Sequence, residues 1–312
     1  MCCVVPFAFL AVVVTSPLQA HDRGPGLESQ RPTSISRRIN DRSEFKILVP
    51  GKHWDLLGGG YQLTGDSAVD RMGNVYFTDS RNNRILKVDL AGKISTWKEG
   101  SNGAHGIAFG PDNRLYAGQH DRKRIVAFSS DGTETVIAEG VRSHHLTVTS
   151  RNDIYLSEPP IHRVWLVDAT GHKRVAHDGI NWPRSVRTST DESILVVNDP
   201  PSPLVWTFQI QADGSLINGQ PFYRLEASDQ KSGTDAGGMV FDSKGFLYVA
   251  TNLGVQVCDR RGRVVAIISA PGKEGVSNVF FGGPGLQWLY MTDGDRIYRR
   301  LAKRHGSALS RR

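Results

Sequence analysis

The sequence predicts an all-β fold, a six-bladed β-propeller, and a sixfold internal repeat is the main reason. An apolar strand, a turn with Asp or Gly and an apolar-aromatic strand recur in copies that begin at Ala68, Ile107, Leu146, Val186, Met239 and Val279. The second-strand centres are separated by 40, 39, 40, 53 and 42 residues, and lie at Tyr76, Tyr116, Tyr155, Leu195, Tyr248 and Tyr290. The 33 glycines suit the many tight turns such a fold needs.

The predicted propeller spans residues 45–302. Residues 45–49 precede the first copy and alternate between polar and apolar, so we expect them to join the last blade and close the ring. The longest spacing predicts an insertion, a loop between residues 211 and 235. A β-sandwich is the structural alternative, but six regular copies favour the propeller.

The N-terminus predicts export. Residues 4–14 form an apolar run followed by Pro17 and Ala20, which is typical of a signal peptide over residues 1–20, although no Lys or Arg precedes the run. A short anchor or a misassigned start is the alternative. Residues 21–44 are polar and predict a flexible leader. Removal of Cys2 and Cys3 would leave Cys258 alone, so we expect a periplasmic or secreted protein without an intramolecular disulfide.

The charge distribution limits the classes of partner. The formal net charge is +7, but residues 47–298 carry only −1, because the basic residues gather near the ends. Residues 303–312 form a basic tail, expected to be solvated or to touch anionic lipid. A near-neutral body predicts no nucleic-acid partner. No apolar stretch of about 20 residues follows the N-terminus, so we expect no transmembrane segment. We also expect a monomer that takes a small-molecule substrate or an anionic ligand.

Several phrases of the repeats are specific enough to compare with known proteins. Among them are GGGYQLTGDSAVDRMGNVYFTDSRNNRILKVD, GGMVFDSKGFLYVATNLGVQVCD and SNVFFGGPGLQWLYMTDGDRIYRR. On these phrases the chain resembles the senescence marker protein/gluconolactonase (regucalcin-like) family. The resemblance implies a six-bladed propeller with one divalent metal ion, calcium or zinc, at its central tunnel. It also implies hydrolysis of a sugar lactone or related ester.

The resemblance implies metal ligands that this sequence has replaced. The family holds its ion with a Glu, an Asn and an Asp, and the matching positions here are Gly65, Arg184 and Gly237. Neither glycine nor the permanently charged guanidinium offers a lone pair to a cation. We therefore expect no metal at those positions. Asp66 and Asp235 are the candidates for a rebuilt site.

Histidine and arginine replace those ligands near the predicted tunnel mouth. We predict His105, His144 and His145 as catalytic residues, because histidine is the usual general base near neutral pH. Arg142 and Arg184, with Trp182 beside them, are predicted to bind the substrate. The structural alternative is that these histidines only make hydrogen bonds within loops.

Three functions follow, and the sequence leaves them open. The first is an exported lactonase-type hydrolase, either metal-dependent or based on histidine. The second is a non-catalytic propeller that binds an anionic small ligand through an Arg/His tunnel. The third is an interaction scaffold that uses the propeller rim and the basic tail. The cofactor is unknown at this stage, since the metal that the resemblance implies lacks its ligands.

Overall fold

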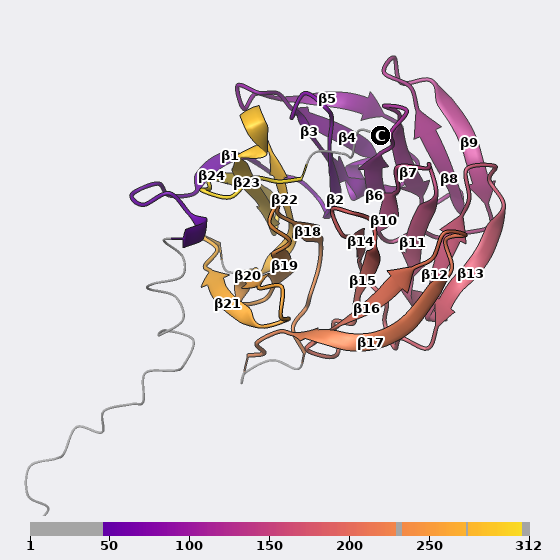
Figure 1. Cartoon of the computed structure of the whole chain (residues 1–312). Helices are drawn as coiled ribbons and strands as arrows, with labels where there is room; N and C mark the ends of the chain where they lie inside the picture. The colour runs from indigo at the N-terminus through magenta and orange to yellow at the C-terminus, as the bar shows by residue number, and fades with distance from the viewer. Residues whose placement is uncertain (1–45, 229–232, 273, 308–312) are drawn as a thin grey trace, which may run out of the picture. The chain divides into compact units, whose positions relative to one another are not determined.

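The computed structural model describes residues 46–228, 233–272 and 274–307. Within these ranges, 24 strands form six four-stranded antiparallel sheets, which lie around a common centre as a six-bladed β-propeller (Figure 1). The predicted fold class is thereby confirmed. The predicted signal peptide, the leader and residues 308–312 lie outside the described residues.

Each of the first five blades uses four consecutive strands, ordered from the centre outward. Blade one has β2 (Thr64–Val69), β3 (Val75–Asp79), β4 (Arg84–Val88) and β5 (Ile94–Glu99). Blade two has β6 (Ala104–Phe109), β7 (Leu115–Gln119), β8 (Arg124–Phe128) and β9 (Glu134–Glu139). Blade three has β10 (Leu146–Val148), β11 (Ile154–Glu158), β12 (Arg163–Val167) and β13 (Lys173–Asp178).

The remaining blades follow the same pattern until the chain closes. Blade four has β14 (Val186–Thr188), β15 (Ile194–Asn198), β16 (Leu204–Ile210) and β17 (Leu216–Arg224). Blade five has β18 (Met239–Phe241), β19 (Leu247–Thr251), β20 (Gly254–Cys258) and β21 (Val264–Ile268). Blade six has β22 (Val276–Gly282), β23 (Trp288–Asp293), β24 (Arg296–Leu301) and β1 (Asp55–Gly59). Short 3-10 turns are η1 (Ser80–Asn82), η2 (Pro159–Ile161) and η3 (Pro284–Leu286).

A recurring pair of Asp and Tyr explains the sequence repeat. In blade one, Asp70 Oδ1 accepts hydrogen bonds from the backbone amides of residues 72 and 74, and Gly73 takes the positive φ of 93° that the turn needs. The Asp70 carboxylate also accepts from the Tyr76 hydroxyl at 3.5 Å. Asp242 and Tyr248 repeat the pair in blade five at 3.3 Å. In these two blades the aromatic strand centre is therefore tied to the turn before it.

The core consists of layers between neighbouring blades. Among the described residues, six buried apolar clusters fill the six blade interfaces. The cluster between blades six and one contains Val75 and Phe77 from one side and Phe280 and Tyr290 from the other. Blade faces that would be exposed in an isolated sheet are thus covered on both sides, and the ring is closed by packing as well as by hydrogen bonds.

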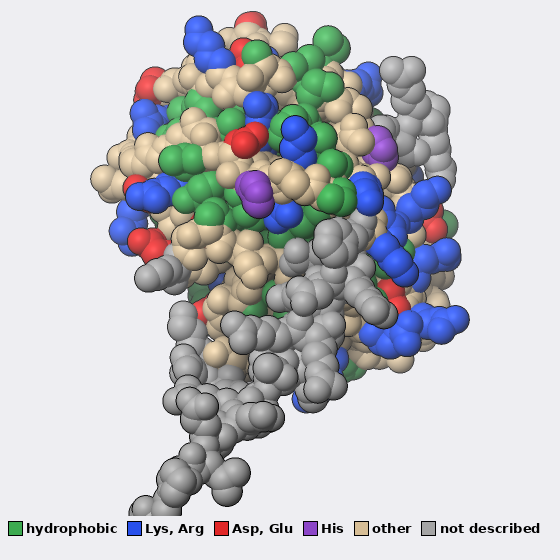
Figure 2. Space-filling model, turned by 90° about the vertical axis from the view of Figure 1, so that its left-hand side faces the viewer, with side chains coloured by type: hydrophobic (Ala, Val, Ile, Leu, Met, Phe, Trp, Pro, Cys, Tyr) green, Lys and Arg blue, Asp and Glu red, His purple; other side chains and the backbone are tan. Residues whose placement is uncertain are grey.

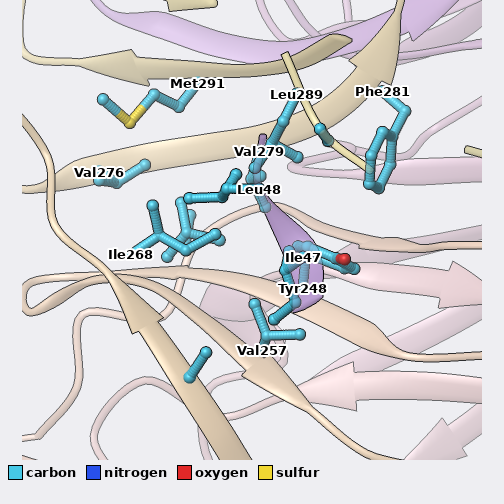
Figure 3. Packing of buried hydrophobic residues seen from close by; sticks show 14 of the residues in the cluster. Ile47, Leu48, Tyr248, Val257, Ile268, Val276, Val279, Phe281, Leu289 and Met291 are labelled. Carbon is cyan, nitrogen blue, oxygen red and sulfur yellow. The ribbon is translucent and has the colours of Figure 1, made fainter. Parts of the chain in front are cut away.

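Ring closure differs from the prediction. The strand added to blade six is β1, which pairs with β24, and not residues 45–49. Leu48 makes one isolated bridge to Ala302, and both Ile47 and Leu48 are buried between blades five and six (Figure 3). Two consecutive buried side chains do not fit an outer strand, whose residues alternate. Strand β1 was missed because its sequence, DLLGG, is mostly exposed and carries no alternation.

Two further segments refine the predicted organisation. The predicted loop between residues 211 and 235 contains a nine-residue strand, β17, so only part of the insertion is irregular. Residues at the start of the basic tail pack on the propeller: the Arg304 guanidinium lies 3.6 Å from Asp242 and 4.2 Å from the centroid of Phe246.

On the face in Figure 2, Lys and Arg lie in several places, with Asp and Glu near some of them. No helix among the described residues has the length and apolar character needed to cross a membrane.

Candidate functional site

The candidate site lies where the inner strands of the blades begin. His105 lies in β6, His144 and His145 directly precede β10, and Arg184 lies two residues before β14. Pairing in β6 is irregular between Ala104 and Ile107, and a similar irregularity occurs near the start of β2 and of β22. Such bulges change the direction of side chains. Because such bulges recur near the start of three inner strands, they change which side chains point toward the tunnel axis and which point away from it.

Three histidines gather there into one cluster. The ring centroids of His105 and His144 are 4.3 Å apart, those of His144 and His145 are 5.1 Å apart, and those of His105 and His145 are 5.8 Å apart. One ring nitrogen from each histidine lies within 4.8 Å of the corresponding nitrogens of the other two. The three residues predicted as catalytic therefore come together in space, although they come from two blades.

Hydrogen bonds fix two of the three rings. His105 Nδ1 lies 2.7 Å from the carbonyl oxygen of His144. His145 Nδ1 lies 3.3 Å from Asp66 Oδ2. A carbonyl and a carboxylate only accept hydrogen bonds, so each Nδ1 carries a proton. In the neutral form of each ring, the lone pair is then at Nε2.

Asp66 is the acidic centre of the site. It is 2% exposed, and its carboxylate accepts from the backbone amides of Ser67 and Ile107 and from Asn278 Nδ2 as well as facing His145. Burial acts to raise the pKa of Asp66, but His145 and Arg187 outweigh it and hold that pKa below its usual value. Asp66 is thus a buried carboxylate with partners from blades one, two, three and six.

Burial keeps the other two imidazoles neutral. It lowers the pKa of His105 to about 4, and nearby His145 adds to the effect. The pKa of His144 lies well below its ordinary value, because of burial first and of His105 and His145 next. Near pH 7 both rings are therefore in the form that has a lone pair to give. Among the described residues, His144 Nδ1 is buried and has no hydrogen-bond partner.

The predicted substrate-binding residues divide into two groups. Arg184 lies near the histidines, since its charge contributes to lowering the pKa of both His105 and His144, and burial lowers its own pKa. Its Nη1 donates to the carbonyl oxygen of Asp235 at 3.4 Å. Arg142 and Trp182 are exposed, and no contact among the described residues joins either side chain to the histidines. The structure thus brings only Arg184 into the cluster.

Arg187 is a member of the site that the sequence analysis did not select. Its guanidinium is buried, which lowers its pKa, and Asp66 opposes that shift. Its Nε donates to the carbonyl oxygen of Met239 at 2.9 Å. Arg187 follows Arg184 by three residues and lies within β14, the strand that Arg184 precedes. A charged residue in an inner strand was the signal that could have identified it.

At two of the positions where the resemblance implies metal ligands, the structure leaves little room for a side chain. A Cβ at Gly237 would lie 2.1 Å from the carbonyl oxygen of Ser277, and one at Gly65 would lie 2.6 Å from Thr78 Oγ1. Backbone therefore blocks a side chain at Gly237 and the Thr78 side chain blocks one at Gly65, while Arg184 supplies a positive charge at the third position. Of the candidates for a rebuilt site, Asp66 is buried beside His145, whereas Asp235 is exposed and reaches Arg184 through its backbone carbonyl.

A cavity of about 660 Å³ lies elsewhere on the propeller. It is formed between blades four and five, at the ends of β14 and β18 opposite Arg184 and Gly237, and its lining includes Ser189, Phe222 and Lys244. It shares no residue with the histidine cluster.

The site lies at the centre of a six-bladed propeller, and comparison with known proteins identifies the family to which this propeller belongs. The chain belongs to the SMP-30/gluconolactonase/LRE-like family, whose model matches residues 64–294. A gluconolactonase from Zymomonas mobilis is 21% identical over 233 residues, which are 65% of this chain and 64% of that protein. The match therefore spans a little under two thirds of that relative's length.

Solved structures of low sequence identity share the fold. A gluconolactonase from Xanthomonas campestris superposes with a TM-score of 0.71 at 20% identity, over 82% of this chain and 91% of that one. The calcium-binding protein regucalcin from Agrobacterium tumefaciens superposes with a TM-score of 0.69 at 16% identity, over 83% of this chain and 98% of that one. The family resemblance inferred from sequence is thereby confirmed.

Proposed function

We propose that this chain hydrolyses a lactone or a related ester at the cluster of His105, His144 and His145. The observation that carries the proposal is the convergence of three imidazoles, two of them held neutral by burial, with the cationic Arg184 in a propeller of the gluconolactonase family. Hydrolysis needs a group that activates water and a group that stabilises an oxyanion, and the cluster offers both.

The proposed reaction follows from the charges of these residues. The imidazoles activate a water molecule. The water oxygen attacks the carbonyl carbon of the lactone, while one water proton moves to an imidazole. Negative charge collects on the former carbonyl oxygen, and the Arg184 guanidinium stabilises it. Collapse of this tetrahedral species breaks the ring C–O bond. The departing oxygen takes up the proton, and the product is a hydroxy acid.

Turnover of glucono-1,5-lactone and of related sugar lactones tests the proposal, with proton release measured above the uncatalysed rate. We expect His144→Ala to lower kcat/KM by about 100-fold or more, as for loss of a group that activates water. Arg184→Ala should lower kcat by about 100-fold, as for loss of one oxyanion donor. His172→Ala is the matched control, because that side chain is 75% exposed and outside the cluster, and its activity should equal that of the parent chain.

A non-catalytic ligand-binding propeller is the second candidate, and two partly buried guanidinium groups favour it. Arg184 lies near the histidines and Arg187 near Asp66, and burial lowers the pKa of both guanidinium groups. Such a site attracts a small carboxylate or phosphate. Absence of turnover on every lactone, together with binding of gluconate that Arg184→Ala weakens, would replace the first candidate with this one.

A further inference from the structure

We propose that His105, His144 and His145 form a binding site for a transition-metal dication, with zinc as the best match. The site differs from the positions Gly65, Arg184 and Gly237, where the chain has no donor and no space. It shares its residues with the proposed function but does not need it, because metal binding is measurable without any turnover. If both hold, the histidines are ligands and the ion activates the water.

The arrangement of donors carries the inference. Zinc binds imidazole nitrogen at about 2.0–2.1 Å in tetrahedral geometry, which places ligand atoms about 3.3 Å from one another. The three nitrogens here already lie within 4.8 Å of one another without an ion. Small rotations about the side-chain torsions close the remaining gap. Three histidines leave one tetrahedral position open, which is the pattern of a catalytic rather than a structural zinc site.

The partners of two rings match those of metal-bound histidines. Histidine ligands typically donate their second ring N–H to a carboxylate or a backbone carbonyl, which fixes the tautomer and the ring direction. His145 Nδ1 faces Asp66 Oδ2 at 3.3 Å, and His105 Nδ1 faces the His144 carbonyl oxygen at 2.7 Å. Both rings therefore have Nε2 available as the ligand atom.

His144 supplies an independent observation. Its Nδ1 is buried and lacks a hydrogen-bond partner among the described residues. A buried polar atom left without a partner destabilises the folded chain. This cost is avoided when the ring turns so that one of its nitrogens coordinates the ion. The other ring nitrogen then forms a hydrogen bond with water or with the fourth ligand of the ion. The three ring centroids form a triangle with sides of 4.3, 5.1 and 5.8 Å, and His144 is its third corner.

The surrounding charges select the kind of ion. Arg184 and Arg187 oppose a hard cation such as calcium, which needs several charged or carbonyl oxygens. Imidazole lone pairs instead suit zinc and its neighbours in the transition series. Asp66, the buried carboxylate that faces His145, partly offsets the positive charge of these arginines. The Arg184 charge acts on both His105 and His144, and it would favour an anionic fourth ligand, hydroxide or a substrate carboxylate.

Zinc titration of the chain lacking any affinity tag tests the proposal. The protein is first dialysed against a chelator and then titrated with zinc chloride and, separately, with calcium chloride by calorimetry. We expect one zinc ion per chain with a Kd of about 1 µM or below, and no comparable calcium binding. His105→Ala and His144→Ala should each weaken zinc binding by at least about 100-fold. Asp66→Asn should weaken it about 10- to 100-fold while the stoichiometry stays at one.

Controls separate this site from accidental binding and from misfolding. His172→Ala should bind zinc as the parent chain does, and circular dichroism should show that each variant keeps its strands. The parent chain loaded with cobalt should give the visible absorption of a tetrahedral site, which requires no variant. Absence of saturable zinc binding, or zinc binding that His105→Ala and His144→Ala leave unchanged, overturns the proposal.

The same measurements distinguish this inference from the proposed function. One zinc ion per chain without turnover of any lactone would support the metal site and contradict the hydrolase. Turnover that survives the chelator, in a chain that binds no zinc, would support the hydrolase and contradict the metal site.

Discussion

At the scale of single residues, the site depends on a carboxylate that the sequence analysis treated as a substitute ligand. Asp66 joins β2 to His145 before β10 and to Asn278 in β22, so one side chain ties three inner strands together. It also lies close enough to Arg187 to oppose the burial-driven shift in the pKa of that group. Its role is therefore structural as well as electrostatic.

We predict that Asp66→Ala destabilises the chain by about 3–5 kcal/mol, because the buried Arg187 charge then loses its counter-charge. The loss of hydrogen bonds from Ser67, Ile107 and Asn278 acts in the same direction. Urea unfolding followed by tryptophan fluorescence measures the change. Asp55→Ala is the control, since Asp55 is exposed in β1 and its removal should cost less than about 0.5 kcal/mol. Equal effects of the two changes would contradict the assigned role.

At the scale of elements, the segment before the first blade and the closing strand have separate tasks. Ile47 and Leu48 are each 2% exposed and pack among side chains such as Tyr248, Val279 and Phe281 (Figure 3). Strand β1 supplies main-chain pairing to the outer edge of blade six, with its side chains mostly exposed. Residues 47–48 thus add apolar side chains to the interface between blades five and six, and β1 covers the outer edge of blade six.

We predict that Leu48→Ala lowers the free energy of unfolding by about 2–5 kcal/mol, because it removes a buried side chain from a packed core. Leu56→Ala in β1 is the matched control, as Leu56 is 55% exposed and the same change should cost little. Thermal and urea unfolding of both variants measure the difference. Similar losses in the two proteins would show that residues 47–48 do not contribute to the core as described.

At the scale of the whole molecule, charge is unevenly distributed: the propeller is nearly neutral, and the basic residues gather near the ends of the chain. The only cysteine among the described residues, Cys258, is buried, and burial raises the pKa of its thiol to about 12. A chain that lost residues 1–20 would keep this single, unreactive thiol, which suits an oxidising compartment. We propose export on this ground together with the apolar N-terminal run.

The export proposal predicts that the mature chain begins near His21. N-terminal sequencing of protein purified from the native source, after separation of soluble cytoplasm from exported material, gives the result. The mass should fall by that of residues 1–20. Recovery of the chain from the cytoplasm with Met1 retained would contradict export and favour a misassigned start.

The sequence by itself determined the number of blades and the chemical types in the site. An Asp followed six residues later by Tyr encodes a turn and the strand after it, and this local signal is present at Asp70 with Tyr76 and at Asp242 with Tyr248. The histidines and Arg184 were found because each precedes or begins an inner strand. Residues about 40 positions apart in such a repeat become neighbours around one tunnel.

Only the tertiary structure decided which of these residues meet. An extended strand sends consecutive side chains to opposite faces, so His144 and His145 could not both be placed in one cluster from their spacing. His144 and His145 lie just before β10, outside its regular pairing, and the pairing of His145 with Asp66 joins blades that are not adjacent. The closing strand was equally hidden, because an exposed outer edge is held by backbone hydrogen bonds and leaves no hydrophobic pattern in its side chains.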